Sequence, residues 1–238
     1  MLLKSAKSFL LALAFTLTGV VAPAAVHADT AGAALTREAQ AAITPAKALE
    51  MLKQGNERFV SGKSIERDYL AQVKQTSSGQ FPFAAVVSCL DSRIPPEIVF
   101  DRGIGDLFVA RVAGNFVNDD ILGSLEFATK LAGAKLILVM GHTECGAVKG
   151  ACDGAQLGLL TATLANINPA VKAVQGDYTP RNSQNAEFVQ AVTEMNVLHT
   201  MQTLRDRSVV LREMIDKGEI GLVGAMYDVS SGRVIFYE

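Results

Sequence analysis

Short apolar runs alternate with segments of helical periodicity along most of the chain. The runs cover residues 83–88, 107–112, 135–140, 220–229 and 234–237. Short apolar segments of this kind are typical of strands buried on both faces of a sheet. Ser230-Ser231-Gly232 separates the last two and favours a hairpin turn. We therefore predict an α/β fold: a mostly parallel central sheet of about four strands, helices on both faces, and an antiparallel edge strand at the C-terminus.

The polar and apolar positions between these runs predict helices. Thr44-Pro45 is an N-cap followed by proline at the first helical position. Expected helices, including one short turn at 95–100, cover residues 45–61, 65–75, 95–100, 119–131, 144–152, 157–173, 184–205 and 209–217. We expect one domain over residues 44–238, preceded by a flexible, Ala-rich lead at 29–43.

The first 28 residues have the pattern of a secretory signal peptide. Lys4 and Lys7 precede an apolar stretch at 9–21, and Val26-His27-Ala28 places small residues at a cleavage site. The apolar stretch is shorter than the ~20 residues that a membrane-spanning helix needs. We expect cleavage after Ala28, export to a bacterial periplasm, and no membrane association of the mature chain.

Charge and cysteine content narrow the classes of function. Without Lys4 and Lys7, 20 basic side chains face 24 acidic ones, so the mature net charge is −4. Such a balance argues against nucleic acid as a partner. Three cysteines cannot all pair in disulfides. Cys152 has no motif around it, and we interpret it as a partly buried thiol.

The chemically dense stretches follow the first and third apolar runs. Cys89, Asp91 and Arg93 alternate after one run, and His142 and Cys145 follow the other. Carboxyl ends of neighbouring parallel strands form the edge at which α/β proteins bind ligands. Two thiols and one imidazole suit zinc. The pattern predicts one zinc ion per chain, held by Cys89, His142 and Cys145.

Three protein ligands leave a coordination position open, which is typical of catalytic zinc. Asp91 could fill it as a fourth ligand in a closed form. Alternatively, Asp91 pairs with Arg93 and accepts a hydrogen bond from zinc-bound hydroxide, which attacks a small electrophile.

The paired motifs C-x-D-x-R and H-x-x-C resemble those of the β-class carbonic anhydrases. The resemblance runs from Pro45 to the C-terminus and includes FDRGIGDLFVARVAGN and GHTECGAVKGA. It implies the same three zinc ligands, an Asp91 and Arg93 dyad, and reversible hydration of carbon dioxide to bicarbonate and a proton. It also implies a homodimer or a tetramer of dimers.

The resemblance places substrate contacts at Arg102, the position nearest to a glutamine of plant-like members, and at Gly146. Family members often read R-N-x-x-N where this chain has Arg111-Val112-Ala113-Gly114-Asn115. This difference leaves the substrate contacts open.

Two alternatives remain for the function, because the motifs do not identify the electrophile. One is hydrolysis of carbonyl sulfide or carbon disulfide on the same scaffold, and the other is a catalytically silent protein that binds zinc or bicarbonate. His199 could shuttle protons, but its place beside an apolar helical stripe favours a packing or surface role.

Overall fold

The computed structural model describes residues 32–237, so the signal peptide expected at 1–28 lies outside the described residues. Five strands form one sheet in the order β2-β1-β3-β4-β5. Their bounds are β1 Ala84–Ser88, β2 Leu107–Arg111, β3 Leu136–His142, β4 Gly221–Tyr227 and β5 Val234–Tyr237. The first four are parallel and β5 runs antiparallel to β4. The predicted fold class is confirmed.

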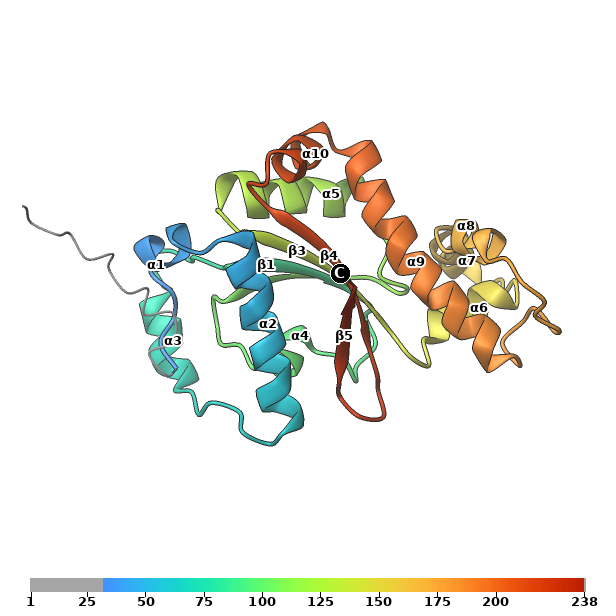
Figure 1. Cartoon of the computed structure of the whole chain (residues 1–238), viewed down its shortest axis with the longest axis horizontal. Coiled ribbons are helices and arrows are strands. Elements are labelled where there is room, and N and C mark those ends of the chain that lie inside the picture. The colour runs from blue at the N-terminus through green and yellow to red at the C-terminus, as the bar shows by residue number, and fades with distance from the viewer. Residues whose placement is uncertain (1–31, 238) are drawn as a thin grey trace, which may run out of the picture.

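Helices cover both faces of this sheet (Figure 1). The core on one face contains side chains of α2 Pro45–Val60, α4 Pro96–Val99, α6 Gly146–Cys152 and α8 Asn168–Ala173. The core on the other face contains side chains of α5 Asp119–Glu126, the π-helical turn η1 Phe127–Leu131 and α10 Val209–Asp216. The long helix α9 Ala186–Arg207 contributes side chains to both cores.

The two central strands show why their sequences are apolar throughout. Every residue of β1 and of β3 is buried. Ala84 and Val86 belong to one core, and Ala85 and Val87 belong to the other. Since successive side chains point to opposite faces, a strand with helices on both sides has no solvent-facing positions.

Gly55 lies in α2 where this helix meets Phe100. A Cβ added at Gly55 would lie 1.9 Å from the Phe100 carbonyl oxygen. Since main-chain atoms cannot swing aside, we expect Gly55→Ala to lower the free energy of unfolding by about 3 kcal/mol and the melting temperature by roughly 10 °C. Calorimetry of the variant and the unaltered protein checks this.

Gly123, within α5, provides the matched control. Nothing lies within 4 Å of a Cβ added there. Gly123→Ala should therefore raise the free energy of unfolding by about 0.5–1 kcal/mol, because alanine favours a helix over glycine. A Gly55→Ala variant as stable as the unaltered protein would contradict the close approach of α2 to Phe100.

The single helix expected over 157–173 is wrong in one respect. The structure has two helices there, α7 Gly158–Ala165 and α8 Asn168–Ala173. Pro169 is the reason, because proline lacks an N–H and its ring clashes with the carbonyl four residues earlier. That carbonyl belongs to Ala165, the last residue of α7. The helix expected over 65–75 is also shorter. It is α3 Tyr69–Gln75, which follows the N-cap Asp68.

Of the lead expected at 29–43, the structure describes residues 32–43, and part of these is helical. Residues 37–41 form the short helix α1 Arg37–Ala41, and Ile43 is buried. The Gln40 side chain donates from Nε2 to the carbonyls of Pro82 and Ala132, at 2.7 and 2.8 Å. These bonds fix the segment to the domain although it has no regular apolar pattern.

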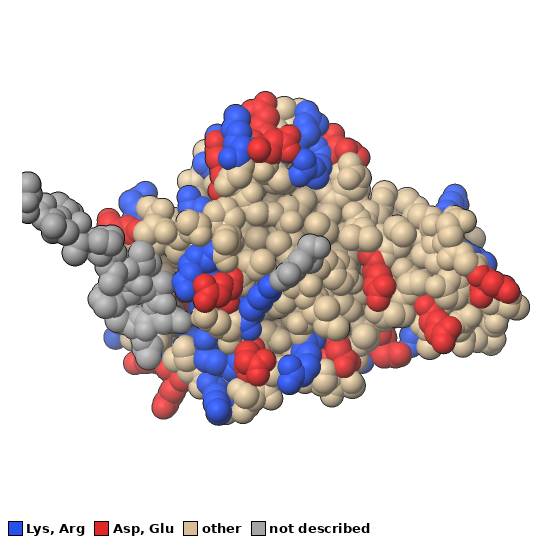
Figure 2. Space-filling view, in the orientation of Figure 1, with Lys and Arg blue, Asp and Glu red and all other residues tan. Residues whose placement is uncertain are grey.

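The molecular surface is mixed in charge. Figure 2 shows acidic and basic side chains interspersed over α10 and along α2, and fewer of either kind on the lobe of α6, α7 and α8. Over α10 the ion pairs include Arg205 with Asp216 at 2.5 Å and Lys217 with Glu213 at 3.4 Å. None of the helices within residues 32–237 has the length and apolar character needed to cross a membrane.

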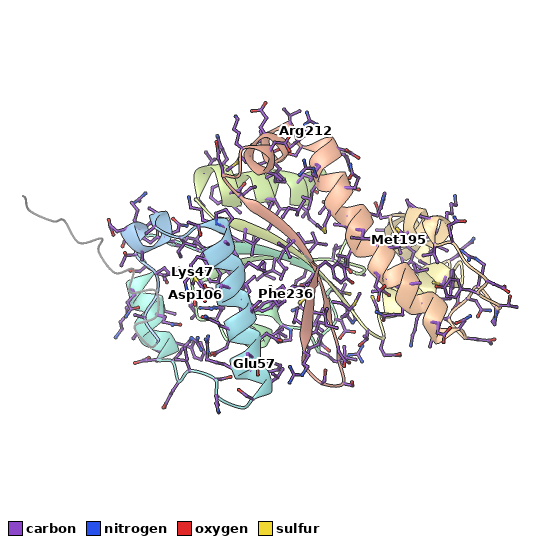
Figure 3. All side chains as sticks on the ribbon, in the orientation of Figure 1. Lys47, Glu57, Asp106, Met195, Arg212 and Phe236 are labelled. Carbon is purple, nitrogen blue, oxygen red and sulfur yellow. The ribbon has the colours of Figure 1, made fainter. Side chains whose placement is uncertain are left out.

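Side chains at the margins complete the larger core. Met195 on α9 and Phe236 on β5, both labelled in Figure 3, are partly buried against it. The Phe236 ring lies 6.2 Å from that of Phe100, centroid to centroid. The C-terminal edge strand is thereby joined to the loop that follows α4.

Candidate metal centre

Cys89 and His142 lie at the carboxyl edge of the sheet, because one follows β1 directly and the other is the last residue of the neighbouring parallel strand β3. Ser88, the last residue of β1, is in register with Met140 of β3. Cys89 is the next residue, and His142 is the last residue of β3. The expectation that both chemical motifs meet at this edge is confirmed by the strand pairing.

Cys145 joins them through a tight turn. Glu144 adopts a left-handed backbone conformation with φ of 58°, and Cys145, the next residue, is the N-cap of α6. The helix expected to begin at Glu144 therefore begins two residues later. The result is that one donor atom from each of Cys89, His142 and Cys145 lies within 4.8 Å of the other two.

The orientation of the His142 ring is fixed from outside the cluster. Its Nδ1 lies 2.8 Å from the Thr143 carbonyl oxygen. A carbonyl only accepts, so Nδ1 carries the proton and Nε2 keeps a free lone pair. This Nε2 is buried and has no hydrogen-bond partner among the described residues. A buried imidazole nitrogen without a hydrogen-bond partner, within 4.8 Å of two sulfurs, suits a metal ligand.

The two thiols influence each other strongly. Cys89 Sγ and Cys145 Sγ are 4.0 Å apart, and both side chains are buried. A hydrogen bond from Cys145, with smaller contributions from the neighbouring His142 side chain and the Gly114 N–H, holds the pKa of Cys89 well below its ordinary value. The same contact, added to burial, raises the pKa of Cys145. The two thiols therefore differ in acidity, and a bound cation would favour the thiolate form of both.

These donors fit zinc. Two thiolate sulfurs and one imidazole are a common zinc set, and three protein ligands leave a position for a small molecule. The ligand atoms are preformed and dry, with exposed fractions of 4% for Cys89 and 0% for His142 and Cys145.

A carboxylate stands beside this cluster, clamped by an arginine. Arg93 donates from Nε to Asp91 Oδ1 at 2.9 Å and from Nη2 to Oδ2 at 2.7 Å. These side-chain bonds hold the pKa of Asp91 well below its usual range. Asp91 Oδ2 lies 4.0 Å from His142 Nε2. The expected pairing of Asp91 with Arg93 is thus present at the edge of the donor cluster.

Arg111 supports the metal centre, and its role was not predicted from the sequence. From the end of β2 it donates to the carbonyl of Cys89 at 3.0 Å and to that of Asp91 at 2.5 Å. It therefore fixes the turn that carries a metal donor and the carboxylate. The only sequence signal was its place in the segment that departs from the family pattern.

The structure places the other candidate residues apart from these contacts. Arg102 is buried, donates to the Met51 carbonyl and lies over the Phe83 ring at 5.0 Å. Gly146 begins α6 beside Cys145, with open space where a Cβ would be. Their roles as substrate contacts stay predictions.

Cys152 and His199, which were expected to lie outside the site, have ordinary positions on helices. Cys152 is partly buried at the end of α6, and burial raises its pKa to about 11. His199 lies on α9, partly buried.

Comparison with known proteins assigns the family. The family model described as carbonic anhydrase matches residues 84–234. Carbonic anhydrase 2 of Mycobacterium tuberculosis is 34% identical over 195 residues, which cover 80% of this chain and 92% of that protein. The carbonic anhydrase of Mycolicibacterium smegmatis is 32% identical over 191 residues, with the same coverage of 80% and 92%.

Solved structures show the same fold. The β-carbonic anhydrase CafA of Aspergillus fumigatus superposes with a TM-score of 0.62 at 24% identity, covering 81% of this chain and 90% of that one. The β-carbonic anhydrase CcaA gives 0.59 at 24% identity, covering 80% and 87%. Given the family match, the relatives at above 30% identity and this shared fold, the chain belongs to the β-class carbonic anhydrases.

Proposed function

We propose that the chain hydrates carbon dioxide reversibly to bicarbonate and a proton, and that five residues carry the reaction. Cys89, His142 and Cys145 hold the zinc ion. Asp91 accepts a hydrogen bond from the attacking water, and Arg93 fixes the position of Asp91. The observation that carries this proposal is the buried donor cluster, within 4.8 Å, beside a carboxylate gripped at both oxygens.

The metal and the protein contribute different parts of the chemistry. When bound, zinc supplies a Lewis acid that brings the pKa of a water at its open position toward neutrality. Asp91 remains ionised because Arg93 holds its pKa low, so it acts only as a hydrogen-bond acceptor. An acceptor fixed at this place orients a water molecule and leaves its lone pair directed toward carbon dioxide.

Arg93 also argues against a closed form in which Asp91 becomes a fourth ligand. Both carboxylate oxygens of Asp91 are engaged by the guanidinium, and a third bond comes from the Arg93 backbone N–H at 2.9 Å. Arg93 Nη2 additionally reaches the Glu144 carbonyl at 3.3 Å. Moving Asp91 onto the metal would break these bonds, so the observed arrangement favours the active form.

Stopped-flow hydration of carbon dioxide, measured on protein of known zinc content from about pH 6 to 9, tests the proposal. We expect activity proportional to zinc, with one ion per chain. Fully zinc-loaded protein without hydration activity would overturn it. Release of sulfide from carbonyl sulfide by such inactive protein would instead support the sulfur-analogue hydrolase.

Arg111 gives a separate prediction. Arg111→Met should lower kcat/KM by roughly tenfold to a hundredfold with zinc content unchanged, because the turn of Cys89 and Asp91 loses its support. Arg233 is the matched control, since its exposed side chain pairs only weakly with Glu57 at 3.7 Å. We expect Arg233→Met to match the unaltered enzyme. Full activity of Arg111→Met would show that the turn holds its shape alone.

We further propose that the mature protein is an exported homo-oligomer. Export rests on the signal-peptide pattern of residues 1–28. Oligomerisation is supported by the unpaired outer edge of β2 and by exposed apolar side chains that include Tyr69, Ile98 and Ile104. Two β-carbonic anhydrases of Sordaria macrospora, similar in fold, are described as tetrameric.

Two measurements test this pair of proposals. N-terminal sequencing of protein recovered from the periplasmic fraction should begin at Asp29. Sedimentation equilibrium of the mature protein should give the mass of a dimer or tetramer, and a monomer mass at micromolar concentration would contradict the second proposal.

A further inference from the structure

Cys89 receives a hydrogen bond from a distant part of the chain. The Gly114 backbone N–H points at Cys89 Sγ, with nitrogen and sulfur 3.4 Å apart. Gly114 lies in the loop between β2 and α5, 25 residues from Cys89. A donated N–H stabilises negative charge on a sulfur and fixes where that sulfur lies. The position of this loop therefore matters to the metal donor.

Gly114 can donate in this direction only in an unusual conformation. Its φ is 88°, which is the left-handed region that favours glycine. A Cβ added there would lie 2.4 Å from Ile167 Cδ1. On the far side of the residue, the Asn115 N–H bonds the Val112 carbonyl at 3.0 Å. The loop is thus bent sharply and confined beneath Ile167.

The Gly114 carbonyl is held by a side chain from another element. Asn196 of α9 donates from Nδ2 to this oxygen at 2.8 Å, across 82 residues of sequence. Asn196 has an exposed fraction of 0%, so water does not compete for the bond. A carbonyl fixed at one end of Gly114 restricts its backbone torsions and so the direction of its N–H.

We propose that Asn196 is a positioning residue for the metal centre. By holding the Gly114 carbonyl, it keeps the Gly114 N–H directed at Cys89 Sγ and thereby strengthens zinc retention. Asn196 bonds the backbone of the loop and acts on the sulfur only through it. This inference rests on the proposed ligation of zinc by Cys89.

Zinc retention in Asn196 variants tests the proposal. Asn196→Ala removes the donor, and Asn196→Ser keeps a polar side chain that is too short to reach Gly114. The probe is zinc itself, transferred from purified full-length protein to a coloured chelator. We expect zinc affinity to fall by roughly tenfold to a hundredfold in both variants. In cobalt-substituted protein, the absorption band from cysteine sulfur to cobalt should also shift or weaken.

Thr200→Val is the matched control. Thr200 lies one turn along α9, is 1% exposed, and its Oγ1 has no partner among the described residues. Removing this hydroxyl should leave zinc affinity and the cobalt spectrum as they are. Thermal unfolding of the metal-free proteins separates a loss of stability from a loss of metal binding.

The outcomes are distinct. Folded Asn196 variants that retain zinc as tightly as Thr200→Val, with an unchanged cobalt spectrum, would overturn the proposal even if their unfolding temperature falls. If Cys89→Ser also retains zinc normally, the ligation itself fails, and with it the proposed function. If Cys89→Ser loses zinc while the Asn196 variants do not, only the role of Asn196 fails.

Discussion

Replacing Cys89 or Cys145 by serine is expected to abolish both zinc binding and hydration activity. Each sulfur is buried, and the two lie 4.0 Å apart beside His142. A serine hydroxyl is a poor zinc ligand and is shorter than a thiol. Loss of the metal removes several kcal/mol of transition-state stabilisation, so we expect activity to fall by about a thousandfold or more. Elemental analysis and stopped-flow assays measure the two effects.

Cys152→Ser is the control for this experiment. Cys152 is a free, partly buried cysteine and takes no part in the donor cluster. Its replacement should leave zinc content and activity unchanged. A Cys145→Ser variant that keeps one zinc ion and full activity would contradict ligation by both cysteines.

Arg93→Ala is expected to separate metal binding from catalysis. The variant keeps all three donors, so zinc content should remain at one ion per chain. Asp91 loses the two-pronged support of the guanidinium and becomes free to turn toward the metal. We expect kcat to fall by roughly a hundredfold to a thousandfold, because the acceptor for the attacking water is no longer fixed.

A conservative variant and a control variant help to interpret the activity of Arg93→Ala. Arg93→Lys should recover only part of the activity, since a single ammonium cannot bond both carboxylate oxygens. Arg205→Ala, which breaks an exposed ion pair with Asp216, should have no effect on activity. Full activity of Arg93→Ala would rule out a catalytic role for the Asp91 and Arg93 pair.

The sequence predicted the sheet and the donor cluster for the same physical reason. Strands buried on both faces are apolar throughout, so Cys89, Asp91 and His142 were conspicuous at the points where two such runs ended. The parallel order of β1 and β3 then brings the two stretches to one edge. Both the fold class and the meeting of the motifs could therefore be predicted from local patterns.

The supporting contacts could not be predicted in this way. Arg111 and Gly114 act on the site through main-chain atoms, and Asn196 acts through Gly114. Hydrogen bonds to carbonyls and N–H groups leave no trace in the hydrophobic pattern. Gln40 is a similar case, because its bonds to two distant carbonyls order a segment that reads as unstructured. By contrast, the break between α7 and α8 was readable from Pro169.

The contacts that support the metal centre come from the last part of the chain, which affects when the centre can form. All three metal donors have been synthesised once Cys145 emerges, but Asn196 and β4, which pairs with β3 up to His142, come later in the chain. A chain synthesised from its N-terminus therefore carries its donors before it carries what supports them. We expect the metal centre to become rigid, and to hold its metal firmly, only after β4 has been synthesised.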